Sequence, residues 1–222
     1  MTMNEELLAQ LKNTYRVTEN DIGEDSLLKA KGMTFRLHTY EAENLGHVCT
    51  LSMSGMGGLM KMETFILCPA GIQMPLLNMD RISVGGLRNT QLVEFYRTAP
   101  EEDAMSDAEY LWIKNRDADL KDYASAARWY SDLLAPYSYA KMAVGKKNRL
   151  SRTCREYMRE YIRRTRIAEP CPAEVKTART SEFAHRLVDE GGAAVDQFRQ
   201  LFGEETTRRV VLHHMYGLPI ED

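Results

Sequence analysis

The sequence predicts an α+β protein, an α/β/α sandwich in which helices flank a central antiparallel sheet. Three observations predict this fold class. Apolar residues recur mostly at every second position before Pro100, and mostly three or four positions apart after it. The loops between the expected strands are short, which favours antiparallel neighbours because parallel strands need long crossovers. Strands followed by helices is the α+β order, and these helices must cover the apolar faces of the sheet.

The part before Pro100 is expected to contain one short helix and a meander of strands. Leu7, Leu8 and Leu11 have helical spacing and predict an amphipathic helix over 4–15. The strands are expected mainly within 33–98, and the alternation of apolar and polar residues is cleanest over 47–54. Glycines in the expected turns are Gly55, Gly57, Gly58, Gly85 and Gly86.

The part after Pro100 is expected to be helical, because apolar residues lie three and four positions apart throughout. Pro170 and Pro172 separate a long basic helix from the next one, since proline disrupts a helix interior. With 222 residues we expect one domain over 1–222, with helices mainly in 101–216. The expected helices are 103–114, 120–134, 149–166, 181–189, 193–202 and 205–215.

Composition excludes several classes of protein. The mean hydropathy is −0.43, and no apolar run approaches the ~18 residues that a membrane span needs. The formal net charge is −3, which argues against a dedicated nucleic-acid binder. The first residues, Met1–Glu6, are acidic where a secretory signal is basic and then apolar, so we expect a cytoplasmic protein.

Cofactor and metal motifs are missing from the sequence. Its four cysteines are scattered without the short spacing of a zinc site or an iron–sulfur cluster, and buried thiols are the simplest interpretation. The five histidines form no HExxH pattern, and no glycine-rich phosphate-binding loop is present. We therefore expect no bound metal.

Two acidic residues are candidates for proton transfer. Asp80 begins an expected strand in apolar surroundings, where burial would raise its pKa and suit it as a proton donor near neutral pH. The commoner role for such an Asp is to accept backbone N–H groups at a turn or strand start. Glu63 lies within an apolar strand and shares parity with Lys61, which favours a solvated position over a buried catalytic one.

Methionines are abundant in the sheet region, and six of the 13 lie within 53–79. Methionine is an adaptable filler that suits a pocket for a large apolar ligand, although plain core packing is the simpler role for any one of them. Met53, Met62 and Met79 are our candidates for ligand contacts, and Arg88, Arg128 and Arg152 are available for ligand carboxylates.

A locally basic segment runs over 146–166. It either binds an acidic partner by charge complementarity or is an ordinary solvated helix face. Nucleic acid is the weaker alternative, because aromatic residues in the segment are few.

Several stretches, taken together, resemble the ferredoxin-dependent bilin reductases. The C-terminal stretch runs from Phe202-Gly203 to Leu218-Pro219 and has the spacing of the end of those enzymes. The stretch 65–69 resembles their strand that ends in proline, and 74–82 resembles the following segment, in which an Asp opens the next strand. A Gly-Gly turn between strands follows in both. The resemblance covers roughly 50–222.

The resemblance implies an α/β/α sandwich that holds a linear or opened tetrapyrrole between the sheet and the C-terminal helices; red chlorophyll catabolite reductases share this fold. It implies an oxidoreductase without bound cofactor, which takes single electrons from reduced ferredoxin and protons from its own side chains. Asp80 matches the central Asp of the family. Members that form phycocyanobilin have a Glu and a His at positions that correspond here to Met53 and Thr64. Glu63 lies one residue from Thr64 and would need a bulge to reach the site.

Three functional hypotheses follow. The first is ferredoxin-dependent reduction of a linear tetrapyrrole, with Asp80 as proton donor and Glu63 as a second candidate acid. Under it, Met53, Met62, Thr64, Met79, Arg88 and Arg152 contact the substrate. The second is a non-catalytic tetrapyrrole-binding protein of the same fold, which the missing Glu and His favour. The third is an interaction module that acts through the basic segment 146–166.

Overall fold

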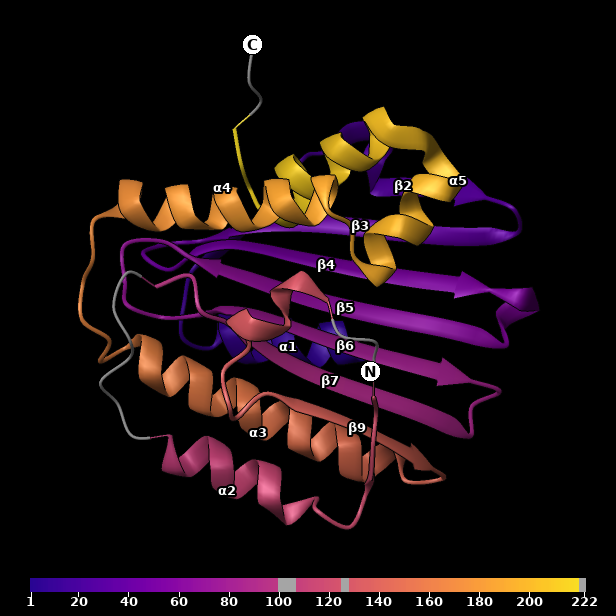
Figure 1. The fold of residues 1–222 in the computed structure, drawn as a ribbon, viewed down its shortest axis with the longest axis horizontal. Coiled ribbons are helices and arrows are strands. Elements are labelled where there is room, and N and C mark those ends of the chain that lie inside the picture. Colours follow the sequence, from indigo (N-terminus) through magenta and orange to yellow (C-terminus); the bar gives the residue numbers. More distant parts are fainter. Residues whose placement is uncertain (100–106, 125–127, 220–222) are drawn as a thin grey trace.

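The computed structural model describes residues 1–99, 107–124 and 128–219 (Figure 1). In these ranges nine strands form one sheet in the order β1-β3-β4-β5-β6-β7-β9-β8, and β2 pairs with β3 outside this order. Every pair is antiparallel, as the sequence predicts. The strands are β1 (Val17–Asn20), β2 (Leu27–Ala30), β3 (Met33–Ala42), β4 (Gly46–Gly55), β5 (Met60–Pro69), β6 (Leu76–Val84), β7 (Arg88–Tyr96), β8 (Lys121–Asp122) and β9 (Tyr139–Val144).

Helices cover both faces of this sheet, which confirms the predicted sandwich. Figure 1 shows α4 and α5 above β3 and β4, with α2 and α3 beside β7 and β9. None of the described helices is long and apolar enough to cross a membrane. The helices are α1 (Met3–Lys12), α2 (Ala108–Arg116), α3 (Lys147–Thr165), α4 (Ala173–Asp189), α5 (Ala193–Arg209) and a π-helix (Val210–Met215), with short 3₁₀ turns at Gly23–Ser26, Met56–Gly58 and Trp129–Leu133.

Tight turns set the register of the central strands. Gly85 and Gly86 join β6 to β7 with φ values of 61° and 70°, the left-handed conformation that glycine adopts most easily and that such hairpins require. The pairing then runs without interruption from Val84 opposite Arg88 to Leu76 opposite Tyr96. Because side chains alternate along a strand, this register decides which residues share a face.

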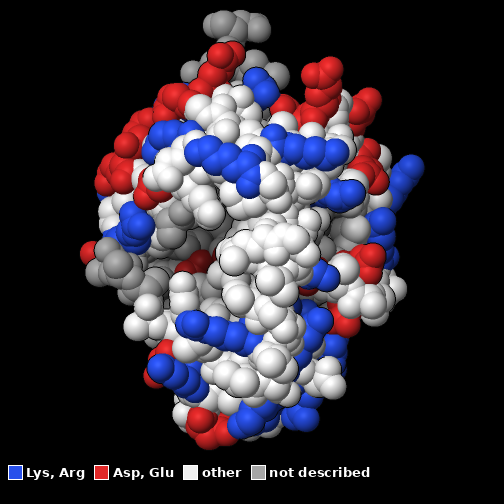
Figure 2. All heavy atoms as spheres, turned by 90° about the vertical axis from the view of Figure 1, so that its right-hand side faces the viewer, with Lys and Arg blue, Asp and Glu red and all other residues white. Residues whose placement is uncertain are grey.

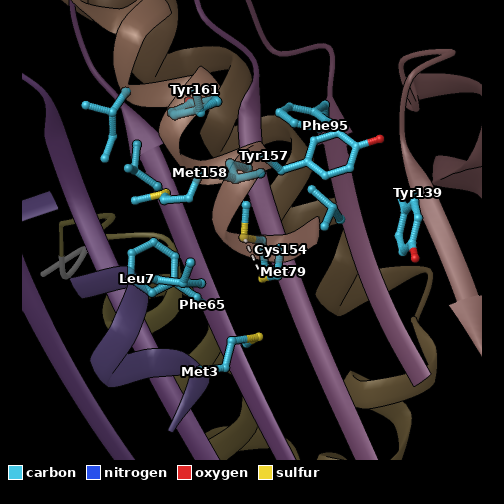
Figure 3. Close-up of a cluster of buried hydrophobic side chains, with 14 of the residues drawn as sticks. Met3, Leu7, Phe65, Met79, Phe95, Tyr139, Cys154, Tyr157, Met158 and Tyr161 are labelled. Atoms are coloured by element: carbon cyan, nitrogen blue, oxygen red, sulfur yellow. Dashed lines mark hydrogen bonds between the residues drawn. The ribbon is translucent and has the colours of Figure 1, made fainter. Parts of the chain in front are cut away.

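One face is packed against α1, α2 and α3 (Figure 3). Figure 3 shows Phe65 of β5 beside Leu7 of α1, and Met79 of β6 beside Cys154 of α3. Phe95 lies 4.8 Å from Tyr110 of α2, measured between ring centroids. This packed face is a continuous apolar core rich in aromatic residues.

The other face meets α4, α5 and the π-helix. Phe35 of β3 makes edge-to-face contacts with Phe198 and Phe202 of α5, each with a centroid distance of 5.4 Å. On β7, Tyr96 packs 4.7 Å from Phe183 of α4. These contacts cover the ends of the face. We call this side the open face, because several residues near its centre, such as Asp80 and Ile82, are only partly buried.

Two sequence predictions after Pro100 are wrong. No helix spans the described part of 120–134, which contains β8 and a 3₁₀ turn, and β9 was not expected. The pattern of β9 is obscured because Lys141 is buried in it, where its Nζ forms a 2.7 Å ion pair with Asp122 Oδ1 of β8. Residues 103–106 and 125–127 of the expected helices lie outside the described ranges.

The other expected helices are present. The segment 149–166 forms most of α3, and 181–189 forms the second half of α4. The expected break between 193–202 and 205–215 is a kink at Gly203, whose φ is 81°, and the chain then continues into the π-helix.

Candidate functional site

Four polar side chains gather at the centre of the open face. The register places Thr64 of β5 beside Asp80 of β6, and Asn78 of β6 beside Glu94 of β7. All four share the face of Tyr96 and Ile66, which belong to the core that α4 and α5 cover. We call Thr64, Asn78, Asp80 and Glu94 the acid cluster.

Hydrogen bonds connect the acid cluster. Thr64 Oγ1 donates to Asp80 Oδ1 at 2.5 Å, and Asn78 Nδ2 donates to Asp80 Oδ2 at 2.8 Å. The same Asn78 nitrogen donates to Glu94 Oε2 at 3.0 Å, and the hydroxyl of Tyr96 donates to that oxygen, also at 3.0 Å. One amide group therefore links two carboxyl groups.

Both carboxyl groups hold a proton more tightly than usual. Burial raises the pKa of Asp80, although hydrogen bonds from Thr64 and Asn78 lower it in part. Burial, together with the negative charge of Asp80, raises the pKa of Glu94 to about 7. Because two neighbouring carboxylates repel each other, the pair retains a proton near neutral pH. A carboxyl group in this state is suited to donate a proton.

Apolar side chains extend the site toward the turns. Met62, Ile82 and Met142 lie in one row across β5, β6 and β9, next to the acid cluster, and all three are only partly buried. Farther along, Val84 is 43% exposed and Val144 70%. Residues at the centre of a sheet are normally covered on both faces, so α4 and α5 leave this part of the face open.

Figure 2 views the molecule from the side of the β4–β5 and β6–β7 turns and shows a hollow with acidic atoms inside it. Asp80 and Glu94 keep some exposed area although protein atoms surround them. That combination is typical of residues at the floor of a narrow opening. The open face thus offers an apolar floor with a small number of polar groups, the usual composition of a site for a small organic molecule.

The structure brings some of the predicted site residues together. Asp80, Thr64, Met62 and Met53 share the open face, although Met53 is only 3% exposed, since the side chains above it fill that part. Arg88 lies at the exposed start of β7 on the same face, where its Nε is 3.1 Å from Met142 Sδ.

Three other predicted residues lie on the packed side. Glu63 and Met79 have the opposite parity to Asp80, and the uninterrupted β5–β6 register contains no bulge that would turn Glu63 around. Met79 is fully buried, and Cys154 Sγ donates to its Sδ at 3.6 Å. Arg152 is on α3 and pairs with Glu156. Glu63, Met79 and Arg152 therefore belong to no site that contains Asp80.

Asn78, Glu94 and Tyr96 were not predicted from the sequence to belong to a site. A usable signal was present, because a hairpin that turns at Gly85–Gly86 pairs residues in order away from the turn. The loop has three residues, Gly85, Gly86 and Leu87, and counting back from a loop of this length places Asn78 opposite Glu94. The polar residues at these positions, in two otherwise apolar strands, mark the same patch as Asp80.

Basic side chains of α3 are partly neutralised by acids of the same helix. Glu160 Oε1 forms ion pairs with Arg163 at 2.7 Å and with Arg164 at 2.9 Å. Arg152 forms an ion pair with Glu156 at 3.3 Å. The helix covers the packed face, away from the acid cluster. The basic segment and the acid cluster thus lie on opposite sides of the sheet.

Metal-binding clusters of three or more His, Cys, Asp or Glu residues are not found in the part of the chain that the structure describes. Cys49, Cys68 and Cys154 are buried free thiols, as expected, and Cys171 is partly buried. Burial raises the pKa of the Cys68 thiol and of the Cys154 thiol to about 12 in each case. These thiols are accordingly unreactive near neutral pH.

Comparison with solved structures finds a similar fold in phytochromobilin synthase from tomato, in the crystal structure of its complex with biliverdin. The alignment covers 97% of this chain and 83% of that chain, with a TM-score of 0.74 and 13% sequence identity. No family model matches the sequence, and no curated protein matches it. At this level of identity the likeness concerns the fold, and the chain has the fold of a bilin reductase.

Proposed function

We propose that this protein binds a linear tetrapyrrole on the open face of its sheet and reduces it with electrons from reduced ferredoxin. The observation that carries the proposal is the acid cluster, in which two linked carboxyl groups with raised pKa values lie on an apolar, partly uncovered floor. A tetrapyrrole-binding structure of the same fold supports the choice of substrate class.

The floor of the open face suits a flat, mostly apolar ligand. Met62, Ile82 and Met142 offer flexible apolar contacts beside the carboxyl groups. Arg88, at the exposed end of β7, offers a guanidinium for a propionate side chain of the ligand. The ligand thereby places its conjugated system over Asp80 and its carboxylates toward solvent.

Reduction of one double bond consumes two electrons and two protons. In the proposed reaction, two molecules of reduced ferredoxin each supply one electron, and the protein supplies the protons. Asp80 donates the first proton to the radical anion that forms after the first electron, and Glu94 holds the second. A desolvated carboxyl group performs this transfer because its pKa lies closer to the working pH than that of an exposed one.

Asn78 and Thr64 position the acids in this scheme. Asn78 holds one oxygen of each carboxyl group, and Thr64 holds the other oxygen of Asp80. A fixed orientation keeps the donated proton aimed at the ligand. Neither side chain titrates near neutral pH, so the two carboxyl groups carry the proton chemistry.

An absorbance titration with biliverdin tests the binding step. A saturable change in the visible spectrum of the pigment at micromolar protein is expected. If the pigment spectrum does not change in the presence of the protein, tetrapyrrole binding on the open face is wrong. Salt-sensitive binding to an acidic protein in the absence of pigment binding would instead favour the interaction module.

The variant Asp80→Asn tests the proton donor. It should keep the pigment spectrum but turn over at least about 100-fold more slowly with reduced ferredoxin, the usual scale for loss of an acid catalyst. The matched control is Glu6→Gln, which changes a largely buried carboxyl group on the packed side, where Glu6 pairs with Arg155. Normal turnover in Asp80→Asn would refute the role of Asp80. Pigment binding without any turnover in the wild type would favour the carrier hypothesis.

A further inference from the structure

We propose that the packed side of the sheet carries a second site, which binds the phosphate group of inorganic phosphate or of a phosphate monoester. The site is a cavity of about 240 Å³ where β5 and β6 meet the beginning of α3. Lys61, Arg81 and Lys147 line it with positive charge, and Glu63 is the acidic residue among the lining side chains. This site is separate from the acid cluster, because Arg81 and Asp80 point to opposite faces of β6.

Arg81 is the residue that indicates a ligand. It is 5% exposed, and its Nε donates to Gln91 Oε1 at 3.1 Å. Its Nη2 is buried without a hydrogen-bond partner. Within the described ranges Arg81 forms no ion pair, and its cross-strand neighbour Glu63 accepts a hydrogen bond from the backbone of Asn4 at 3.3 Å. A buried cation without a counterion is costly, so the structure favours an anion beside it.

The beginning of α3 is a second, independent indication. This helix is 19 residues long, its N-cap Lys146 makes no side-chain cap, and its first turn contains no acidic residue. Its first residue, Lys147, lines the cavity. The N-terminal end of a helix carries partial positive charge and free N–H donors, so lysines there are unfavourable unless an anion is bound nearby.

The donors in the cavity match a tetrahedral oxyanion. Lys61, Lys147 and the guanidinium of Arg81 supply N–H groups, and Ser83 supplies a hydroxyl group. Three positive charges outnumber the single carboxylate of Glu63. A neighbouring cavity of about 460 Å³ shares Lys61, Glu63, Arg81 and Lys147, and it leaves room for the organic part of a monoester.

Thermal unfolding of the full chain tests this site. The melting temperature is measured against inorganic phosphate, and separately against phenyl phosphate, with sodium chloride replaced so that the ionic strength stays constant. A saturable rise in melting temperature is expected, because a ligand that binds only the folded state stabilises it. A response to inorganic phosphate alone assigns the free ion, and a stronger response to phenyl phosphate assigns a monoester.

Variants that change the charge of the cavity should weaken or strengthen phosphate binding in predictable directions. Lys147→Gln and Lys61→Gln change exposed side chains and should each weaken phosphate binding by about tenfold. Glu63→Gln removes the negative charge from the cavity and should strengthen binding. The control Lys29→Gln, an exposed lysine on β2, should leave it unchanged. Arg81→Met should abolish the rise in melting temperature with phosphate. If this variant does not fold, the two lysine variants alone test the site. A rise that is not saturable, or that is the same in Lys147→Gln as in the wild type, overturns the proposal.

Discussion

The two faces of the central strands differ in how completely their side chains are buried. On the packed face, aromatic rings meet at short distances, as Tyr110 and Tyr137 do at 4.7 Å, and Phe95 is fully buried. On the open face, Asp80 and Glu94 remain partly exposed. Met79 and Asp80 are neighbours in sequence, yet one belongs to a dry core and the other to a candidate site. Alternation along a strand thus allows one segment to serve both purposes.

The largest effect is expected from truncation on the packed face. Phe95→Ala should lower the free energy of unfolding by about 3 to 5 kcal/mol, since it leaves a cavity among several rings. Pigment affinity of the folded protein should be unchanged. Met62→Ala on the open face should cost less than about 2 kcal/mol, because Met62 is only partly buried, but should weaken pigment binding about tenfold. Denaturant unfolding measures the stability of both variants, and pigment titration measures their affinity. Equal losses of stability in the two variants would contradict the difference between the two faces.

Glu94 should make the stability of the protein depend on pH. Its pKa rises from 4.5 to about 7 on folding, so the folded state binds a proton that the unfolded chain has already released. Stability from this proton is therefore complete below pH 4.5 and is lost as the pH rises through 7, by on the order of 3 kcal/mol.

The variant Glu94→Gln isolates that contribution. The glutamine side chain can keep both hydrogen bonds of Glu94 with its single carbonyl oxygen, because Asn78 and Tyr96 both donate to the same atom, Oε2 of Glu94. Relative to the wild type, the variant should gain stability between pH 4.5 and 7 and keep this gain at pH 8. Denaturant unfolding at a series of pH values measures the difference. A difference that stays constant over this range would contradict the raised pKa.

A smaller loss is expected at the kink of α5, which helps to cover the open face. Gly203 has φ 81° and ψ 174°, a conformation essentially restricted to glycine. No atom lies within 4 Å of a Cβ added there, so backbone strain is the sole penalty of Gly203→Ala, about 1 to 3 kcal/mol. Thermal unfolding of Gly203→Ala measures this penalty. The variant Gly192→Ala is the comparison, because its Cβ would lie 2.8 Å from Leu187 Cδ1 and its penalty would come from a steric clash.

The smallest effect is expected from the amide that links the two acids. Hydrogen bonds from Asn78 lower the pKa of both Asp80 and Glu94, so Asn78→Ala should raise both values. If protonated acids drive turnover, the alkaline limb of the pH–rate profile should move to higher pH. Asn89→Ala changes a buried amide of β7 on the packed face and should leave that limb in place. A shift to lower pH in Asn78→Ala would refute the link between the acids.

Much of the fold follows from local patterns. Much of the meander over 33–98 was predictable because the β4–β5 and β6–β7 hairpins combine glycine-containing turns with alternating strands. In contrast, β9 depends on a buried Lys141 whose partner Asp122 is brought close only by the fold. The short strands β1 and β2 contain no fully buried residue, so burial does not mark them in the sequence. Tertiary pairing decides such segments, and local propensity does not.

The site was predictable to a lesser degree. Asp80 stood out because it interrupts an apolar segment, and Thr64 was indicated by the family resemblance. The parity of Glu63 with Lys61 already favoured a face away from Thr64, and without a bulge in the β5–β6 register Glu63 cannot reach Asp80. Glu94 needed the register between two strands, which follows from the position of the turn. Burial, which raises both pKa values, depends on helices that begin 79 or more residues after Glu94, since α4 starts at Ala173.

The order of the elements along the chain has a consequence for how the protein matures. The strands β3 to β6 each pair with the next strand in sequence, so most of the sheet can assemble from nearby segments, which favours fast folding. The helices α4 and α5 and the π-helix come after every strand. The packed face therefore has all its covering elements before the open face does, and the open face is the last part of the molecule to be covered.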